Sequence, residues 1–167
     1  DIYQQAGEQL KDPLHTTQAI LQSFRVEYVG TTDEPWDSLA HHKDFASKSA
    51  PFTLSPSFRP DKAIQIHHPA AFRQSVQLLE QASGVRITSV ATLLEAFHNR
   101  IRFFHEHGCR VSDHGLNYMP PVNVFSAELE KEFETFLQNQ DAVYSNPDAL
   151  MGHLLLELCR LYHLYGW

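Results

Sequence analysis

Arg59, Asp113 and His114 carry the side chains of this sequence best suited to chemistry on a small polar molecule. The planar guanidinium of Arg59 can donate two parallel hydrogen bonds to a carboxylate. The adjacent carboxylate and imidazole of Asp113 and His114 can bind hydroxyl groups or relay a proton. We therefore expect Arg59 to bind substrate, with His114 and Asp113 as the catalytic pair.

These side chains also have structural alternatives. Arg59 can form an ion pair with Asp61 or Asp33 that ties two loops together; we favour a role in the site because a buried arginine is costly unless it is partnered. Asp113 can cap the loop that follows it through backbone amides. His114 is the better functional candidate of the two.

Thr31, Thr32 and Asp33 form a second polar cluster. Their oxygens can hydrogen-bond the hydroxyl groups of a substrate, so all three are candidate substrate-binding residues. Threonine and aspartate just before a helix are also common capping residues, and capping is the alternative role of this cluster.

Each polar cluster follows a short apolar run, which predicts strands over 26–31, 52–57 and about 108–111. In α/β proteins with parallel strands, ligands bind at the carboxyl ends of the strands. The recurrence predicts an α/β fold of about three parallel strands with flanking helices, and a site at the edge where the strands end.

Periodic apolar residues and capping signals predict the helices between these strands. The strongest pattern starts at Thr88 or Ser89, repeats apolar residues at spacings of three and four, and stops at Gly108. The other helices are expected at 2–12, 18–24, 36–43, 69–83, 126–138 and 146–166.

With 167 residues, 43% of them apolar, the chain can bury one core, so a single domain over 1–167 is expected. The formal net charge of −7 gives no electrostatic reason for a nucleic acid or an anionic membrane as partner. No apolar run reaches transmembrane length. Cys109 and Cys159 both fit core positions in a reducing cytoplasm; a nucleophilic Cys109 is the alternative.

Eleven histidines suggest a metal site, but their spacing argues against one. His41-His42 and His67-His68 are adjacent pairs whose side chains diverge. The pair at His105 and His107 closes a predicted helix before Gly108, where solvated histidines suit the carbonyl end. We predict no metal ligands among the residues of this chain.

Three segments together resemble the uronate isomerase family: Gly-Thr-Thr-Asp-Glu-Pro-Trp-Asp-Ser-Leu at 30–39, Ser-Phe-Arg-Pro-Asp-Lys at 57–62 and Gly-Cys-Arg-Val-Ser-Asp-His-Gly-Leu at 108–116. The resemblance extends over nearly the whole chain and is weakest around 119–145. Glu34 stands where the family often has aspartate.

The resemblance implies the middle of a (β/α)8 barrel of the amidohydrolase superfamily, with strands two to four. It implies interconversion of glucuronate with fructuronate and of galacturonate with tagaturonate. The family's divalent metal, zinc by expectation, would be held by residues outside this chain. A non-catalytic module that binds acidic sugars, and a piece of a related metal-dependent hydrolase, are the alternatives; Ser-Asp-His at 112–114 argues against the hydrolase, which often has a metal-bridging Lys or Glu there.

A partial barrel leaves parallel strand edges and one side of its helices uncovered. Because this chain has neither the family's metal pair nor all of the barrel's strand-end residues, we expect it to be inactive alone. We also expect it to self-associate, unless its termini fold over the exposed edges.

Overall fold

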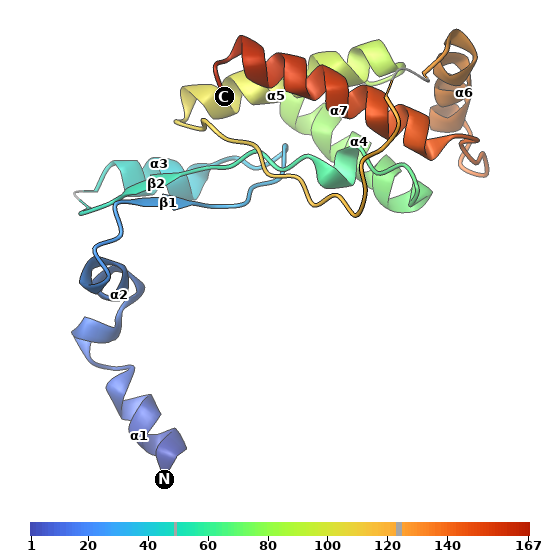
Figure 1. Cartoon of the computed structure of the whole chain (residues 1–167). Coiled ribbons are helices and arrows are strands. Elements are labelled where there is room, and N and C mark those ends of the chain that lie inside the picture. The colour runs from blue at the N-terminus through green and yellow to red at the C-terminus, as the bar shows by residue number, and fades with distance from the viewer. Residues whose placement is uncertain (49, 123–124) are drawn as a thin grey trace.

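A computed structural model describes residues 1–48, 50–122 and 125–167 (Figure 1). Two short parallel strands, β1 (Tyr28–Gly30) and β2 (Thr53–Ser55), form the sheet of these ranges. Tyr28 pairs with Thr53 and Gly30 with Ser55. The crossover between the strands contains α3 (Ala40–Ala46), which packs against β2. The chain is therefore an α/β structure, and both strands are shorter than predicted.

The prediction of a third strand at 108–111 is wrong within the described residues. The chain there makes an isolated parallel bridge, between Phe58 and Ser112. The Phe58 N–H donates to the Val111 carbonyl at 3.1 Å, and the Asp113 N–H donates to the Phe58 carbonyl at 3.0 Å. The pairing is parallel, as expected, but these two hydrogen bonds are not continued into a ladder.

The helices lie close to their predicted positions. Those in the first half of the chain, besides α3, are α1 (Ile2–Gln9), the 3₁₀ turn η1 (Pro13–His15), α2 (Thr17–Ser23) and the 3₁₀ turn η2 (Asp61–Ala63). The second half contains α4 (Pro69–Ser83), α5 (Val90–Glu106), α6 (Ala127–Gln138) and α7 (Pro147–Leu164). Each long helix therefore begins within one or two residues of its sequence signal.

Local signals account for the ends of these helices. Ser89 and Thr92 form a reciprocal capping box at the start of α5, which satisfies two free backbone N–H groups. The Asn146 side chain caps α7 through the Ala149 N–H at 3.1 Å. Gly84 ends α4 with φ of 72°, a left-handed conformation that glycine adopts without a steric penalty.

The predicted helix over 36–43 begins four residues later than expected. Leu39 has φ of 54° and is the residue before α3, so the helix starts at Ala40. The Asp37 carboxylate accepts the Leu39 N–H at 2.6 Å. Arg100 of α5 donates a hydrogen bond from its Nε to the Pro35 carbonyl at 2.6 Å. These contacts hold the segment before Ala40 as a loop.

The core lies where α4, α5, α6 and α7 pack together beside the sheet (Figure 1). Phe58 belongs to this core and is fully buried, with its ring edge-on to Phe104 of α5 at a centroid distance of 5.0 Å. Tyr162 of α7 and the C-terminal Trp167 also contact Phe58. The residue that bridges to Ser112 is thus fixed by the two longest helices.

Histidines at the end of α5 are half-buried, so the prediction that they are solvated is wrong. The Trp167 indole N–H donates to His105 Nδ1 at 3.0 Å. His107 Nδ1 lies 2.7 Å from the Phe103 carbonyl. The C-terminal segment therefore folds back over the end of α5, a contact between residues that are far apart in the sequence.

The helices α1 and α2 extend away from the rest of the molecule, and all residues of α1 are exposed (Figure 1). They do not fold over the sheet. No helix in the described ranges is both long and apolar enough to cross a membrane. Cys109 is buried as predicted, but Cys159 is exposed, which corrects its assignment to the core.

Candidate functional site

Backbone pairing brings the predicted site residues to one edge. Parallel bridges join Asp33 to Phe58 and Phe58 to Ser112. The Arg59 N–H donates to the Asp33 carbonyl at 3.0 Å. Because Arg59 and Asp113 each follow a bridged residue, both side chains emerge at the edge where the pairing ends. The expectation that the polar clusters converge on one edge is therefore confirmed.

Arg59 makes two ion pairs of different strength. Its Nε donates to Asp61 Oδ2 at 2.9 Å, and its Nη1 lies 3.4 Å from Asp113 Oδ2. The hydrogen bond with Asp61, then the charge of Asp113, raises the pKa of Arg59 above its usual value. Of the two alternatives for Arg59, the described residues contain the ion pair with Asp61 and none with Asp33. The guanidinium is therefore cationic, and Asp61 orients it through Nε.

Asp61 was identified in the sequence only as a possible partner of Arg59, yet its carboxylate lies at the centre of the cluster. Its side chain is 13% exposed. Oδ2 accepts the Gly115 N–H at 2.8 Å, in addition to Arg59. Oδ1 lies 3.6 Å from His114 Nδ1. The Arg-Pro-Asp spacing, with Pro60 restricting the backbone between the two charges, is the sequence signal that could have indicated this role.

His114 lies between Asp61 and α7. Its Nε2 is 3.2 Å from the hydroxyl of Tyr162, a residue of the last helix that the sequence did not single out. Burial lowers the pKa of His114, against the raising effect of Asp61 and Asp113. Burial also raises the pKa of Tyr162, which stays a phenol. His114 is therefore a neutral imidazole near pH 7, with one nitrogen facing a carboxylate and the other a hydroxyl.

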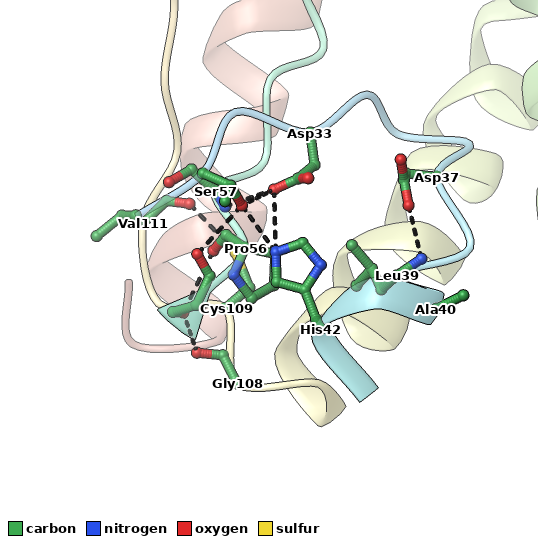
Figure 2. A network of polar contacts seen from close by, with 12 residues as sticks. Asp33, Asp37, Leu39, Ala40, His42, Pro56, Ser57, Gly108, Cys109 and Val111 are labelled. Carbon is green, nitrogen blue, oxygen red and sulfur yellow. Dashed lines mark hydrogen bonds and ion pairs between the residues drawn. The ribbon is translucent and has the colours of Figure 1, made fainter. Parts of the chain in front are cut away.

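A second network joins Thr31, Asp33 and His42; Figure 2 shows the last two of these residues. The Thr31 hydroxyl has one hydrogen, and its oxygen lies 2.5 Å from Asp33 Oδ2, so it donates there. His42 Nε2 lies 2.7 Å from the Thr31 hydroxyl oxygen and must therefore donate a hydrogen bond to it. The Ser57 N–H donates to Asp33 Oδ2 at 3.2 Å.

Figure 2 shows the His42 imidazole directed at Asp33, where the adjacent-pair interpretation had left this histidine without a role. His42 is 8% exposed, and its Nδ1 is buried without a hydrogen-bond partner among the described residues. Asp33 does not cap a helix, because its carboxylate serves Thr31 and Ser57. This network holds the ends of β1 and β2 together.

The remaining predicted residue of this group, Thr32, is exposed, and its side chain makes no hydrogen bond within the ranges described. For Asp113, no backbone N–H of those same ranges donates to its carboxylate, so the capping alternative is not seen. Its side chain is 44% exposed beside Arg59. Both side chains are accessible from solvent at the edge.

Residues 1–167 match the glucuronate isomerase family from end to end. The chain belongs to this family. It is 34% identical to the uronate isomerase of Flavobacterium johnsoniae over 99% of its own length and 35% of that protein. It is 35% identical to the uronate isomerase of Shouchella clausii, again over 99% of this chain and 35% of the relative. The chain spans about a third of the length of these relatives.

Two solved structures share the fold. The uronate isomerase of Thermotoga maritima aligns with a TM-score of 0.80 over 90% of this chain and 33% of that one, at 23% identity. The glucuronate isomerase of Caulobacter crescentus aligns with a TM-score of 0.81 over 92% of this chain and 32% of that one, at 22% identity. The resemblance inferred from the three segments at 30–39, 57–62 and 108–116 is thus confirmed at the level of the family.

Proposed function

We propose that this chain is the central part of a uronate isomerase barrel, and that Arg59 binds the carboxylate of the hexuronate substrate. The observation that carries the proposal is the exposed guanidinium at the shared edge. Its Nε is held by Asp61 at 2.9 Å, and Nη2 makes no hydrogen bond within the described part of the chain. Nη2 is therefore available to meet a carboxylate, whereas Nη1 lies 3.4 Å from Asp113 Oδ2.

Isomerisation of an aldose to a ketose moves a proton between adjacent carbons while the carbonyl is polarised. In this proposal Asp113 and His114 are the catalytic pair, placed next to the bound carboxylate. Asp113 is the more accessible of the two for direct contact with substrate. His114 is neutral near pH 7 and can accept a proton once the Tyr162 hydroxyl turns away from Nε2. Thr31, Thr32 and Asp33 are proposed to line the substrate side of the same edge.

The family resemblance also implies a divalent metal in the whole enzyme. Across residues 1–48, 50–122 and 125–167, no group of three or more His, Cys, Asp or Glu side chains is placed to hold one. The described residues therefore do not form a site for this metal. Ligands contributed by other parts of the enzyme remain a proposal.

The test uses the longer protein encoded by the parent gene, with glucuronate and galacturonate as substrates and NMR detection of the ketose products. We expect turnover by the longer protein and none by the 167-residue chain. Loss of a hydrogen-bonded charged partner costs on the order of 10- to 150-fold in binding. Arg59→Ala should therefore raise KM by about that factor.

Arg102→Ala, on the exposed side of α5, is the matched control and should leave KM unchanged. Arg59→Lys should recover only part of the loss, because an ammonium lacks the planar pair of donors. Absence of turnover by the longer protein would support the non-catalytic module instead. Turnover with an unchanged KM in Arg59→Ala would remove Arg59 from the site.

A further inference from the structure

We propose that Asp61 is a positioning residue, which fixes the direction of the Arg59 guanidinium from behind. The predicted orientation of Arg59 concerns this chain alone, whereas the predicted effect of Asp61 on catalysis rests on the proposed function of Arg59. The nearly buried carboxylate takes Nε, the one donor of the guanidinium that points back along the side chain. This leaves the two Nη groups without a contact to Asp61: Nη1 lies 3.4 Å from Asp113 Oδ2, and Nη2 lies against the backbone of Gly115.

The two carboxylates on Arg59 differ in how firmly they are held. Asp61 is 13% exposed and accepts two hydrogen bonds, from Arg59 Nε and the Gly115 N–H. Asp113 is 44% exposed and contacts only Nη1, at 3.4 Å, beyond the usual N–H···O range. A carboxylate with two short bonds and little exposure is ordered, so Asp61, not Asp113, sets the orientation.

Gly115 completes the arrangement because a side chain there would collide with it. A Cβ added at Gly115 would lie 2.6 Å from Arg59 Nη2 and 3.1 Å from Asp61 Oδ2. This glycine therefore permits the close approach of the guanidinium. The backbone at Gly115 therefore forms a floor under the Arg59–Asp61 pair.

Asp61 is itself linked to α7 through His114. Asp61 Oδ1 and His114 Nδ1 are both buried, have no hydrogen-bond partner among the described residues and lie 3.6 Å apart. The carboxylate favours the tautomer with hydrogen on Nδ1, which leaves Nε2 to accept the Tyr162 hydroxyl at 3.2 Å. The direction of Arg59 is thus tied to a residue of the packed core.

The first experiment measures the Arg59 Nε–H signal by ¹⁵N NMR in the 167-residue chain. We expect exchange with water at least tenfold slower than for the exposed Arg102. Asp61→Asn should remove that protection and shift the signal towards that of Arg102. Asp113→Asn is the matched control and should leave the Nε–H signal in place, because Asp113 contacts Nη1.

An Nε–H signal that follows Asp113→Asn, or that ignores Asp61→Asn, overturns the proposal. If Asp61→Asn does not fold, the wild-type chain decides alone: exchange as fast as that of Arg102 contradicts an ordered Nε contact. Neither result depends on isomerase activity, so this arm stands whether or not the proposed function is correct.

The second experiment is a double-mutant cycle in the longer protein. If Asp61 acts through Arg59, Asp61→Asn should raise KM about 5- to 20-fold. The same substitution should have no further effect on KM in the Arg59→Ala background. A purely structural defect would instead change kcat as well as KM, and by the same factors whether or not Arg59 is present. Fully additive effects of the two substitutions would show that Asp61 acts independently of Arg59.

Discussion

Replacement of Arg100 should unfold the loop before α3, which follows the cluster of Thr31, Thr32 and Asp33. Arg100 is 6% exposed on α5, and its guanidinium donates to the carbonyls of Pro35 at 2.6 Å, Asp37 at 2.7 Å and Ala82 at 3.2 Å. It also lies over the Phe103 ring, 4.1 Å from the centroid. One side chain therefore joins the loop before α3 to the end of α4.

The expected cost follows from what Arg100→Met leaves behind. Methionine keeps most of the apolar length, but three carbonyl oxygens lose a charged donor, each contributing about 1.5–3 kcal/mol. Relief from burying a cation, which lowers the pKa of Arg100 in the native chain, offsets part of this sum. We expect a net loss of about 3–5 kcal/mol, a large share of the stability of a domain of this size.

Urea unfolding followed by circular dichroism measures this loss, read as a lower midpoint at an unchanged slope. Arg102→Met on the same helix is exposed and should change stability by no more than about 0.5 kcal/mol. Amide hydrogen exchange at Asp37 and Leu39 should accelerate in Arg100→Met alone. Equal urea midpoints for Arg100→Met and Arg102→Met would show that Arg100 does not stabilise this loop.

Three further outcomes can be checked on the chain itself. Because burial lowers the pKa of His114, this imidazole binds a proton more readily in the unfolded state than in the folded state. The free energy of unfolding should therefore be at its full value above about pH 6.5 and should fall as the pH drops through that value towards the folded pKa. His114→Gln should flatten this part of the pH profile, although Asp61, Asp113 and Arg59 still face the site. Burial raises the pKa of the Cys109 thiol to about 11, so a thiol reagent at pH 8 should modify the exposed Cys159 rapidly and Cys109 only on unfolding; two fast thiols in the native chain would contradict the burial. Apolar side chains are exposed on and around the N-terminal helices, at Ile2, Tyr3, Leu10, Leu14 and Phe24. We therefore expect the chain to self-associate as its concentration increases, and a constant mass of 19.1 kDa in sedimentation velocity would exclude this.

Elements set by neighbouring residues were predicted from the sequence. The bounds of α4 follow from Pro69 in its first turn and Gly84 after its last, and α5 begins where the Ser89 cap indicated. The start of α3 could not be predicted in this way. Pro35 and Asp37 resemble helix-start residues, but their carbonyls are taken by Arg100, a residue more than 60 positions away. Local propensity is overridden where a distant side chain captures the backbone.

The candidate site divides along the same line. Arg59 and Asp113 were identified because residue type and a position after an apolar run suffice to place them at an edge. The roles of Asp61, His42 and Tyr162 depend on what faces them. Tyr162 occupies an apolar stripe of α7 and reads as a core residue, yet its hydroxyl meets an imidazole 48 positions earlier in the chain.

A buried polar atom can be recognised in a sequence only when its partner is also known, because the cost of burial is removed by the pair and not by either residue. Asp61 illustrates this: in the sequence it is only a possible ion-pair partner of Arg59, and in the structure the same carboxylate contacts Arg59, Gly115 and His114 at the centre of the cluster. Sequence reasoning therefore locates the edge and the group that faces solvent. The residues that hold that group in place emerge only from the packing behind it.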